Sequence, residues 1–287
     1  MIPRGGAMNT EPSNQERLPP ATTIFEVEAE VTDLWSVEAS SVQLILHAPA
    51  IAATCKPGQF VMVRCADGYD PLLPRPFTVY QADREGGDFH ILVKNVGRGS
   101  AWLQRRRKGD RLQVTGPLGH GFTIPAELSM ALLIGGGTGT AALGLLAAEL
   151  TQRGSATENV SALIGAHTRG ECICVGHFGE LCGDDGVRLW ITRDGLEKEL
   201  DRLSATLKDH HRGEGGVHVF AAGPHGMLRR VTHFAATHCL PCQVSVEAKM
   251  ACGVGVCQSC ICRQASGKPY LLVCADGPVF DSRAVRL

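Results

Sequence analysis

In Ala131-Leu-Leu-Ile-Gly-Gly-Gly-Thr-Gly-Thr140 a short apolar run passes directly into a glycine-rich turn. The apolar run indicates a buried strand, and the alanine-rich segment after the turn indicates a helix that ends at Arg153-Gly154. Strand, glycine turn and helix in this order are typical of an α/β domain with a parallel sheet.

The turn contains the pattern Gly137-x-Gly139-x-x-Ala142 between the expected strand and helix. Glycines let the backbone approach a pyrophosphate closely, and a helix N-terminus offers it free N–H groups. We therefore expect Gly135, Gly137, Gly139 and Thr140 to bind nucleotide phosphate. A tight turn without a ligand is the alternative.

The sequence does not show which residue would distinguish NAD from NADP. A usual dinucleotide fingerprint places an acidic residue about 20 positions further on, where it binds the ribose. Here Glu171 lies much further along the chain and has Arg169 beside it. An arginine favours a 2′-phosphate and a glutamate a free 2′-hydroxyl, so NAD and NADP both stay open.

The segments after the glycine turn extend the α/β pattern. Strand-like runs occur at Val160–Ala166, Val187–Thr192 and Val217–Ala222, with a helix expected from about Gly226 to Thr237. Strands that alternate with helices predict a parallel sheet, so residues 127–240 are assigned to a nucleotide-binding α/β domain.

Residues 23–126 contain short strand-like runs separated by turn residues, which predicts a small antiparallel barrel or sandwich. The expected strands are Phe25–Val31, Val42–Leu46, Phe60–Val63, Phe77–Tyr80, His90–Val96 and Arg111–Val114. Residues 1–22 are rich in Pro, Asn, Ser and Gln and are expected to be a disordered tail.

Cysteines near the C-terminus are spaced as Cys252-x4-Cys257-x2-Cys260-x13-Cys274. Plant-type ferredoxins hold a 2Fe-2S cluster with this spacing of three close cysteines and a distant one. The glycines between Cys252 and Cys257 suit a loop that points backbone N–H groups at sulfur. We predict a 2Fe-2S module over residues 241–287, with these cysteines as its ligands.

Disulfides, structural zinc and buried free thiols are the alternatives for these cysteines. Disulfides need an oxidising compartment, and the N-terminus has no apolar run typical of a signal peptide. Zinc ribbons usually pair two Cys-x2-Cys hairpins, whereas here one cysteine stands alone after a long gap. Some of the remaining cysteines are expected to be small buried residues, and Cys239-Leu-Pro-Cys242 is interpreted as structural rather than as a redox motif.

A second motif, Arg75-Pro-Phe-Thr78-Val-Tyr80, is followed by Gly97-Arg-Gly99-Ser100. Together they resemble the FAD site of the ferredoxin-reductase-like flavoproteins. The resemblance implies that Arg75 meets the pyrophosphate, that Thr78 and the nearby backbone contact the isoalloxazine, and that Gly99-Ser100 cradles phosphate at a helix start. An ordinary barrel turn is the alternative.

Length and charge exclude several other classes of function. The chain has 287 residues, 44% hydrophobic content and a net charge of −1, which suits two domains and a small module. No apolar stretch approaches the roughly 18 residues of a membrane span, and the near-neutral charge gives no electrostatic basis for nucleic-acid binding. We expect a cytoplasmic protein.

The order of all these motifs resembles the electron transfer subunit family of class 1B dihydroorotate dehydrogenase, over roughly residues 23–282. The resemblance is carried, besides the cysteine module, by Gly116-Pro-Leu-Gly-His-Gly-Phe122, Ala222-Gly-Pro-His-Gly-Met227, Val244-Ser-Val-Glu247 and Asp276-Gly-Pro-Val-Phe280.

This resemblance implies FAD on the barrel, NAD(H) at the α/β domain and a 2Fe-2S cluster near a separate FMN-binding catalytic subunit, in a hetero-oligomer such as a heterotetramer. Electrons from dihydroorotate, in pyrimidine biosynthesis, would pass through the partner's FMN, the cluster and FAD to NAD+. No catalytic residue is expected on this chain. By motif position the FAD residues would be Arg75, Pro76, Phe77, Thr78, Leu92, Val93, Lys94, Gly99 and Ser100.

One segment departs from the family pattern. Where the family usually shows a glycine-rich segment that begins Thr-Asp-Asp-Gly, this chain has the shortened Thr192-Arg-Asp-Gly-Leu-Glu197. The segment helps to build the nicotinamide side, so the nucleotide preference stays open. Two other functions also stay open: an NAD(P)H-dependent flavin and 2Fe-2S reductase subunit of another redox complex (sulfur, hydrogen or ferredoxin metabolism), and a zinc-stabilised, non-enzymatic interaction protein.

Overall fold

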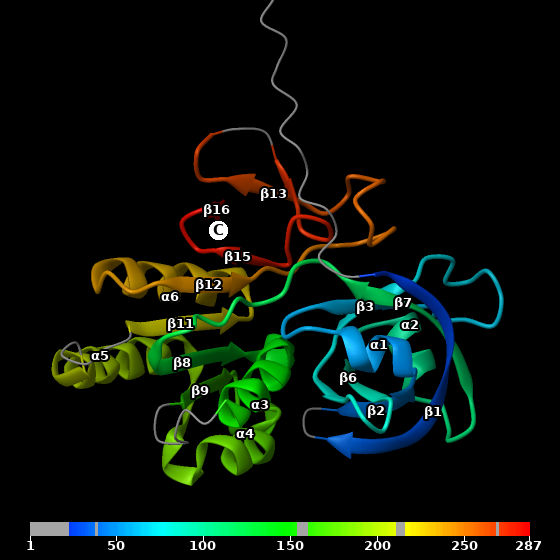
Figure 1. Cartoon of the computed structure of the whole chain (residues 1–287), viewed down its shortest axis with the longest axis horizontal. Helices are drawn as coiled ribbons and strands as arrows, with labels where there is room; N and C mark the ends of the chain where they lie inside the picture. The colour runs from blue at the N-terminus through cyan, green and yellow to red at the C-terminus, as the bar shows by residue number, and fades with distance from the viewer. Residues whose placement is uncertain (1–22, 38–39, 154–159, 211–215, 268–269) are drawn as a thin grey trace, which may run out of the picture.

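The chain folds into a barrel, an α/β unit and a small C-terminal module, which Figure 1 shows in blue to cyan, green to yellow, and orange to red. The computed structural model describes residues 23–37, 40–153, 160–210, 216–267 and 270–287. The tail expected at residues 1–22 lies outside the described residues. The architecture of an antiparallel barrel, a parallel-sheet domain and a cluster module confirms the fold class that the sequence predicts.

The barrel is a seven-stranded antiparallel sheet with the strand order β4-β3-β7-β1-β2-β6-β5. Its strands are β1 (Phe25–Val37), β2 (Ser41–His47), β3 (Phe60–Val63), β4 (Arg75–Thr78), β5 (Gln81–Asp83), β6 (Asp88–Lys94) and β7 (Arg111–Leu118). The helix α1 (Pro49–Thr54) was not expected from the sequence, whereas α2 (Arg98–Leu103) begins at the Gly99-Ser100 motif, where a helix start was expected.

The two edge strands of this sheet, β4 and β5, follow each other in the chain. Val79 N donates a hydrogen bond to Gln59 O (3.0 Å), and Tyr80 N donates one to His90 O (2.8 Å). The adjacent residues Val79 and Tyr80 thus bond to opposite sides of the sheet. This pairing closes the sheet into a barrel and leaves few strand edges unpaired.

The α/β unit is built on a sheet with the order β10-β9-β8-β11-β12-β15, in which all pairs are parallel except β12 with β15. Its strands are β8 (Leu128–Gly136), β9 (Val160–Ala166), β10 (Val187–Ile191), β11 (Gly216–Ala222), β12 (Cys242–Ser245) and β15 (Val279–Asp281). Its helices are α3 (Gly144–Gln152), α4 (Val175–Cys182), α5 (Thr192–His210) and α6 (His225–Thr237), with 3-10 helices η1 (Gly137–Leu143), η3 (Arg169–Glu171) and η4 (Asp184–Gly186).

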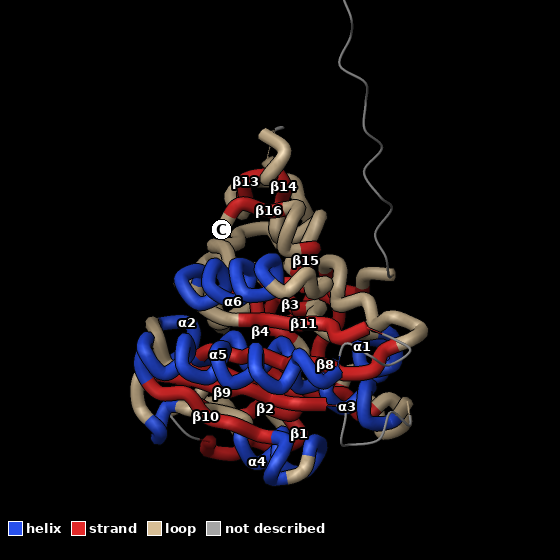
Figure 2. The backbone as a smooth tube through the Cα atoms, turned by 90° about the vertical axis from the view of Figure 1, so that its left-hand side faces the viewer, coloured by secondary structure: helices blue, strands red, loops and turns tan. Residues whose placement is uncertain are grey.

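The helices cover both faces of this sheet. Helices α5 and α6 lie in front of the sheet in Figure 2, and they share one hydrophobic core with it, while α3 and α4 pack into a separate core on the other face. Burial on both faces explains why the central strand β8 is apolar along most of its length. The glycine turn after β8 continues as the 3-10 helix η1 before α3 begins, where the sequence predicts a single helix.

The C-terminal module contains a small sheet of β13 (Ile261–Gln264), β14 (Leu271–Leu272) and β16 (Val285–Arg286). Strands β12 and β15, which fall within the residues 241–287 expected as the cluster module, are paired into the α/β sheet. Met62 and Leu118 of the barrel share a core with Cys260 and Cys274 of the module. The cysteine module is therefore packed against both larger parts.

The barrel and the α/β unit meet along β5, α3 and α4. The ring of Tyr80 packs so closely on Gly144 that an added Cβ would lie 2.4 Å from the ring, and it stacks edge-on against His177. Gln81 Nε2 lies 2.8 Å from His177 Nδ1, and Arg84 forms an ion pair with Glu149. Burial lowers the pKa of His177.

Among the described residues, no helix combines the length and the apolar character that crossing a membrane requires.

Candidate functional site

The cysteines of the predicted cluster site come together in the loops around β13. Cys252 and Cys257 lie in the loop between β12 and β13, Cys260 directly precedes β13, and Cys274 follows β14. The Sγ atoms of Cys260 and Cys274 are 3.1 Å apart. Residues distant in sequence thus meet at one end of the module.

Backbone N–H groups point at these sulfur atoms. Cys252 Sγ accepts from the N–H groups of Val254 (3.5 Å) and Cys257 (3.4 Å), and Cys274 Sγ accepts from Gly255 N–H (3.2 Å). Gly253, with φ +72°, gives the loop the left-handed turn that aims these groups. Such a nest of N–H groups stabilises the negative charge of thiolates and inorganic sulfides, so the residues fit an iron–sulfur cluster.

The sulfurs differ in environment. A hydrogen bond from the Ser259 hydroxyl, together with backbone N–H groups, lowers the pKa of the exposed Cys257 to about 6, while burial raises the pKa of Cys274 to about 12. Within the described part of the chain, no three His, Cys, Asp or Glu side chains are grouped so that they could hold a single metal ion.

All twelve cysteines lie within the described residues and are free thiols. Cys55, Cys65, Cys182 and Cys242 are buried, and burial raises their pKa values to about 11 or 12. These four cysteines are small buried residues, as expected for some of the thiols, whereas Cys239, in the turn after α6, is exposed.

A cavity of about 270 Å³ lies where the barrel, the nucleotide turn and the cluster segment meet. The barrel contributes residues of β4 and β6, the turn contributes Thr138 and Ala141, and the segment before the cysteines contributes Glu247 and Met250. The cavity lies on the barrel face where the FAD motif is found, so the residues present fit a flavin ring between barrel and α/β unit.

Among the predicted FAD residues, Pro76, Phe77, Thr78, Leu92 and Lys94 line this cavity. The other predicted residues do not. Burial alternates along β6, so the Val93 side chain points into the barrel core, between the outward-facing neighbours that line the cavity.

Arg75, Gly99 and Ser100 lie together beside the cavity. A Cβ added to Gly99 would lie 3.5 Å from Arg75 Cγ, so the two motifs that the sequence separates are neighbours. Ser100 Oγ accepts hydrogen bonds from Val96 N (2.9 Å) and Gly97 N (3.0 Å) and thereby orders the turn before α2. This places one basic side chain and an ordered turn where the resemblance expects a pyrophosphate.

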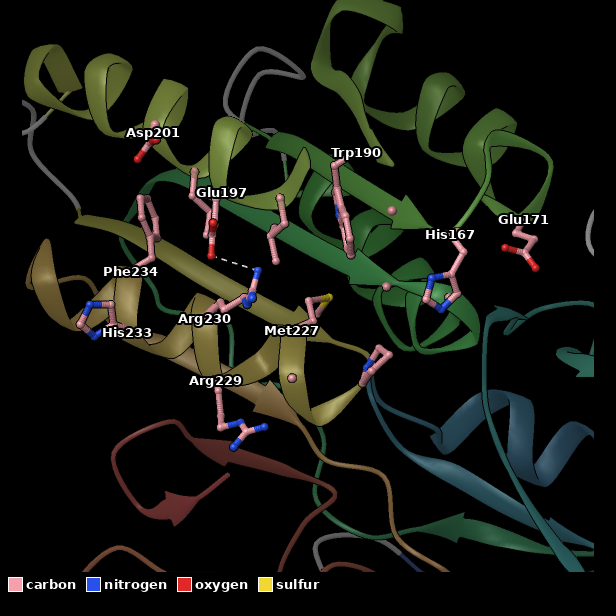
Figure 3. A pocket seen from close by; sticks show the side chains of 18 of the residues that line it. His167, Glu171, Trp190, Glu197, Asp201, Met227, Arg229, Arg230, His233 and Phe234 are labelled. Atoms are coloured by element: carbon pink, nitrogen blue, oxygen red, sulfur yellow. Dashed lines mark ion pairs between the residues drawn. The ribbon is translucent and has the colours of Figure 1, made fainter. Parts of the chain in front are cut away.

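A larger cavity, of about 840 Å³, opens at the carboxyl ends of the parallel strands and continues between α5 and α6 (Figure 3). Such an edge is where open α/β sheets bind nucleotides. Gly137 lines the cavity together with Gly136 and Thr138, which the sequence analysis did not select.

Gly135, Gly139 and Thr140, the other predicted nucleotide residues, lie behind the cavity wall. A Cβ on Gly139 would lie 2.5 Å from the Gly223 backbone, so only glycine lets the turn approach the end of β11 this closely. Thr140 is fully buried, and its hydroxyl has no hydrogen-bond partner among the described residues. This hydroxyl packs against Gly135, where an added Cβ would lie 2.7 Å from it, so Thr140 shapes the turn from behind the cavity wall.

We call the cavity of about 270 Å³ the flavin cavity and the cavity of about 840 Å³ the nucleotide cavity. Lys94 and Thr138 line both, so the two cavities meet at these side chains. The sequence analysis selected Lys94 for FAD alone and did not select Thr138. Their shared position arises because β6 of the barrel faces the turn after β8, a contact that no local pattern encodes.

Two further cavity residues escaped the sequence analysis. Trp190, at the end of β10, lays its indole over Gly165, where an added Cβ would overlap the ring. Glu247 reaches solvent at the mouth of the flavin cavity, but the surrounding protein removes enough water to raise its pKa. The signal for both was their position at or just after a strand end.

Family models match two parts of the chain. Residues 28–122 match the oxidoreductase FAD-binding domain, and residues 247–286 match the iron-sulfur cluster binding domain of dihydroorotate dehydrogenase B. With the α/β sheet between them, these domains define a flavin- and iron–sulfur-containing oxidoreductase subunit of the ferredoxin-reductase-like fold.

Curated relatives narrow this class. The chain is 32% identical, over 89% of its length and 96% of the relative's, to the electron transfer subunit of dihydroorotate dehydrogenase B (NAD(+)) from Desulforamulus reducens. It is 35% identical to the subunit of the same name from Geobacillus thermodenitrificans, over 85% of this chain and 92% of that one. The chain belongs to the family of dihydroorotate dehydrogenase B electron transfer subunits.

Solved structures share the fold. One from a study of flavin-based electron bifurcation, of an NADH-dependent reduced ferredoxin-NADP oxidoreductase, superposes with a TM-score of 0.73 and 27% identity, covering 91% of this chain and 90% of that one. The ferredoxin reductase of carbazole 1,9a-dioxygenase superposes with a TM-score of 0.62 at 22% identity, covering 77% and 68%.

Proposed function

We propose that this chain carries electrons from dihydroorotate, oxidised on a separate FMN-binding subunit, to NAD+ by way of its own iron–sulfur cluster and FAD. The observation that carries the proposal is the meeting of three sites. The flavin cavity touches the nucleotide cavity at Lys94 and Thr138, and it touches the segment leading to the cysteines at Glu247 and Met250.

A flavin supplies the chemistry that joins a two-electron nicotinamide to a one-electron cluster. The chain's own residues position the partners of that exchange. Pro76, Phe77 and Leu92 give the cavity an apolar wall that excludes water, and Lys94 places a cationic side chain where the two cavities meet. Arg75 and the turn at Gly99 supply the anion-binding side.

The proposed partner would dock beside the cluster. Exposed apolar side chains surround the cysteine loops: Val254, Val256 (78% exposed), Ile261 and Tyr270. Apolar groups gathered at a surface favour burial by another protein.

We extend the proposal to a hetero-oligomer with the FMN-binding subunit. We place this assembly in the cytoplasm, where free thiols are the rule. We likewise propose that residues 23–126, 127–240 and 241–287 form the FAD-binding domain, the NAD-binding domain and the cluster module.

The experiment has two stages. The purified chain should show flavin and iron–sulfur absorption, with one FAD and two irons per chain. Co-expressed with a candidate FMN-binding subunit, it should support dihydroorotate oxidation coupled to NAD+ reduction, whereas the chain alone should not. A colourless protein that carries one zinc ion would contradict the proposal and support the alternative of a zinc-stabilised, non-enzymatic interaction protein.

A reductase subunit of another redox complex is the second candidate. The observation in its favour is the likeness, at 27% identity over most of both chains, to the structure of an NADH-dependent reduced ferredoxin-NADP oxidoreductase. Cofactor-loaded chain that reacts with NADH but never couples to dihydroorotate oxidation with an FMN-binding partner would favour this candidate.

A further inference from the structure

An ion pair crosses the nucleotide cavity from one helix to the other. Glu197 Oε1 of α5 lies 3.0 Å from Arg230 Nη1 of α6, and Figure 3 draws it as a dashed line across the opening. Both side chains line the cavity. The pair separates the strand-end part, near His167, from the part between the helices, near Phe234.

The shortened segment after β10 explains why a carboxylate stands here. Strand β10 ends at Ile191 and α5 begins at Thr192, with no loop between them. The first turns of α5 therefore start at the carboxyl edge of the sheet. Leu196, Glu197 and Leu200 occupy helix positions that face the same side and line the cavity.

The charge around the pair is unfavourable for a further anion. Glu197 and Asp201 both line this half of the cavity, and Glu197 already engages the guanidinium of Arg230. The neighbouring Arg229 also lines the cavity, but its guanidinium extends toward the C-terminal module in Figure 3.

Glu171, the acid that the sequence offered for the ribose, lies at the opposite end of the cavity in Figure 3. Its Oε2 accepts a hydrogen bond from Thr168 N (3.2 Å) and caps the short helix η3. This local use makes Glu171 the weaker candidate for reading a ribose.

We propose that Glu197, held by Arg230, sets the nucleotide preference of this subunit: it accepts the free 2′-hydroxyl of an adenosine ribose and rejects a 2′-phosphate. The inference rests on the proposed function, because it takes the cavity to hold a nicotinamide dinucleotide. A carboxylate accepts a hydrogen bond from a ribose hydroxyl, whereas a phosphomonoester carries about −1.5 to −2 charges near neutral pH and is repelled. Specificity then comes from a repulsive element as well as an attractive one.

The test measures binding of non-redox fragments to the cofactor-loaded chain by calorimetry, with ADP-ribose and 2′-phospho-ADP-ribose as probes. Wild type should favour ADP-ribose by about tenfold or more, which corresponds to about 1.4 kcal/mol. Glu197→Gln should shift the ratio of the two dissociation constants at least about tenfold in favour of 2′-phospho-ADP-ribose. Adding Arg230→Gln should reverse that gain, because the guanidinium is its source.

Glu127→Gln is the matched control. Glu127 is exposed and directly precedes β8, at the amino edge of the sheet and outside the cavity, so this variant should leave the ratio unchanged. The inference fails if Glu197→Gln leaves the ratio unchanged, or if Glu171→Gln produces the shift instead, while NADH binding would still uphold the proposed function. Failure of the wild-type chain to bind NADH or either fragment would overturn both.

Discussion

Replacing Gly253 by alanine should detach the cysteine loop from the barrel and release the cluster. Gly253 has φ +72°, and a Cβ built on it would lie 2.6 Å from Met62 Cγ and 3.2 Å from Leu118 Cδ1. Met62 is buried in β3, and its Cγ is close to the backbone, so the contact cannot be relieved by moving the end of the side chain alone. The methyl group therefore meets both a backbone and a packing penalty.

The magnitude follows from these two terms. A left-handed alanine costs about 1–2 kcal/mol, and overpacking a well-filled core costs typically about 1–3 kcal/mol more. Gly267 provides a matched control, since its φ is +74° and an added Cβ would meet nothing within 4 Å. In Gly267→Ala the free energy of unfolding should fall only by the cost of a left-handed alanine.

The assay compares iron per FAD after purification, the visible cluster absorption and the free energy of unfolding in urea. Gly253→Ala should lose most of its iron and about 2–5 kcal/mol, whereas Gly267→Ala should keep its iron. In a double-mutant cycle, Met62→Ala makes room for the methyl, so the two changes together should cost less than their sum by about 0.5–3 kcal/mol. Equal losses at Gly253 and Gly267, or strict additivity with Met62→Ala, would refute the reasoning.

Further expectations concern the cluster ligands and the domain contact. Cys257→Ser should abolish the iron–sulfur spectrum while Cys262→Ser leaves it largely intact, because Cys262 lies in β13 and turns its buried side chain into the core; equal loss in both variants would contradict the choice of ligands. Burial lowers the pKa of His177 below its ordinary value near 6.5, so the unfolded chain binds more protons at mildly acidic pH. The contribution of His177 to stability is thus complete above about pH 6.5 and is lost as the pH falls toward the depressed pKa. Melting temperatures measured from neutral to mildly acidic pH should fall less steeply in His177→Gln, which keeps a polar partner for Gln81, and an unchanged slope would count against this role.

Local sequence signals located most elements of the fold. Val160–Ala166 was expected over the same residues that form β9, because a buried parallel strand is apolar throughout. The short helix α1 and the pairing of β15 with β12 escaped prediction. Six-residue helices have little periodicity, and strand pairing depends on partners far away in the sequence.

The sequence alone determined the chemistry that this chain can carry. The spacing of Cys252, Cys257, Cys260 and Cys274 indicates a cluster, because three of these ligands come from one loop and leave a local pattern. The tertiary structure decided where the sites meet. Lys94 and Thr138 border both cavities only because β6 of the barrel packs against the turn after β8, and Glu197 faces Arg230 only because α5 starts where β10 ends. Such contacts join residues distant in sequence through packing, and packing depends on the whole chain rather than on any one segment of it.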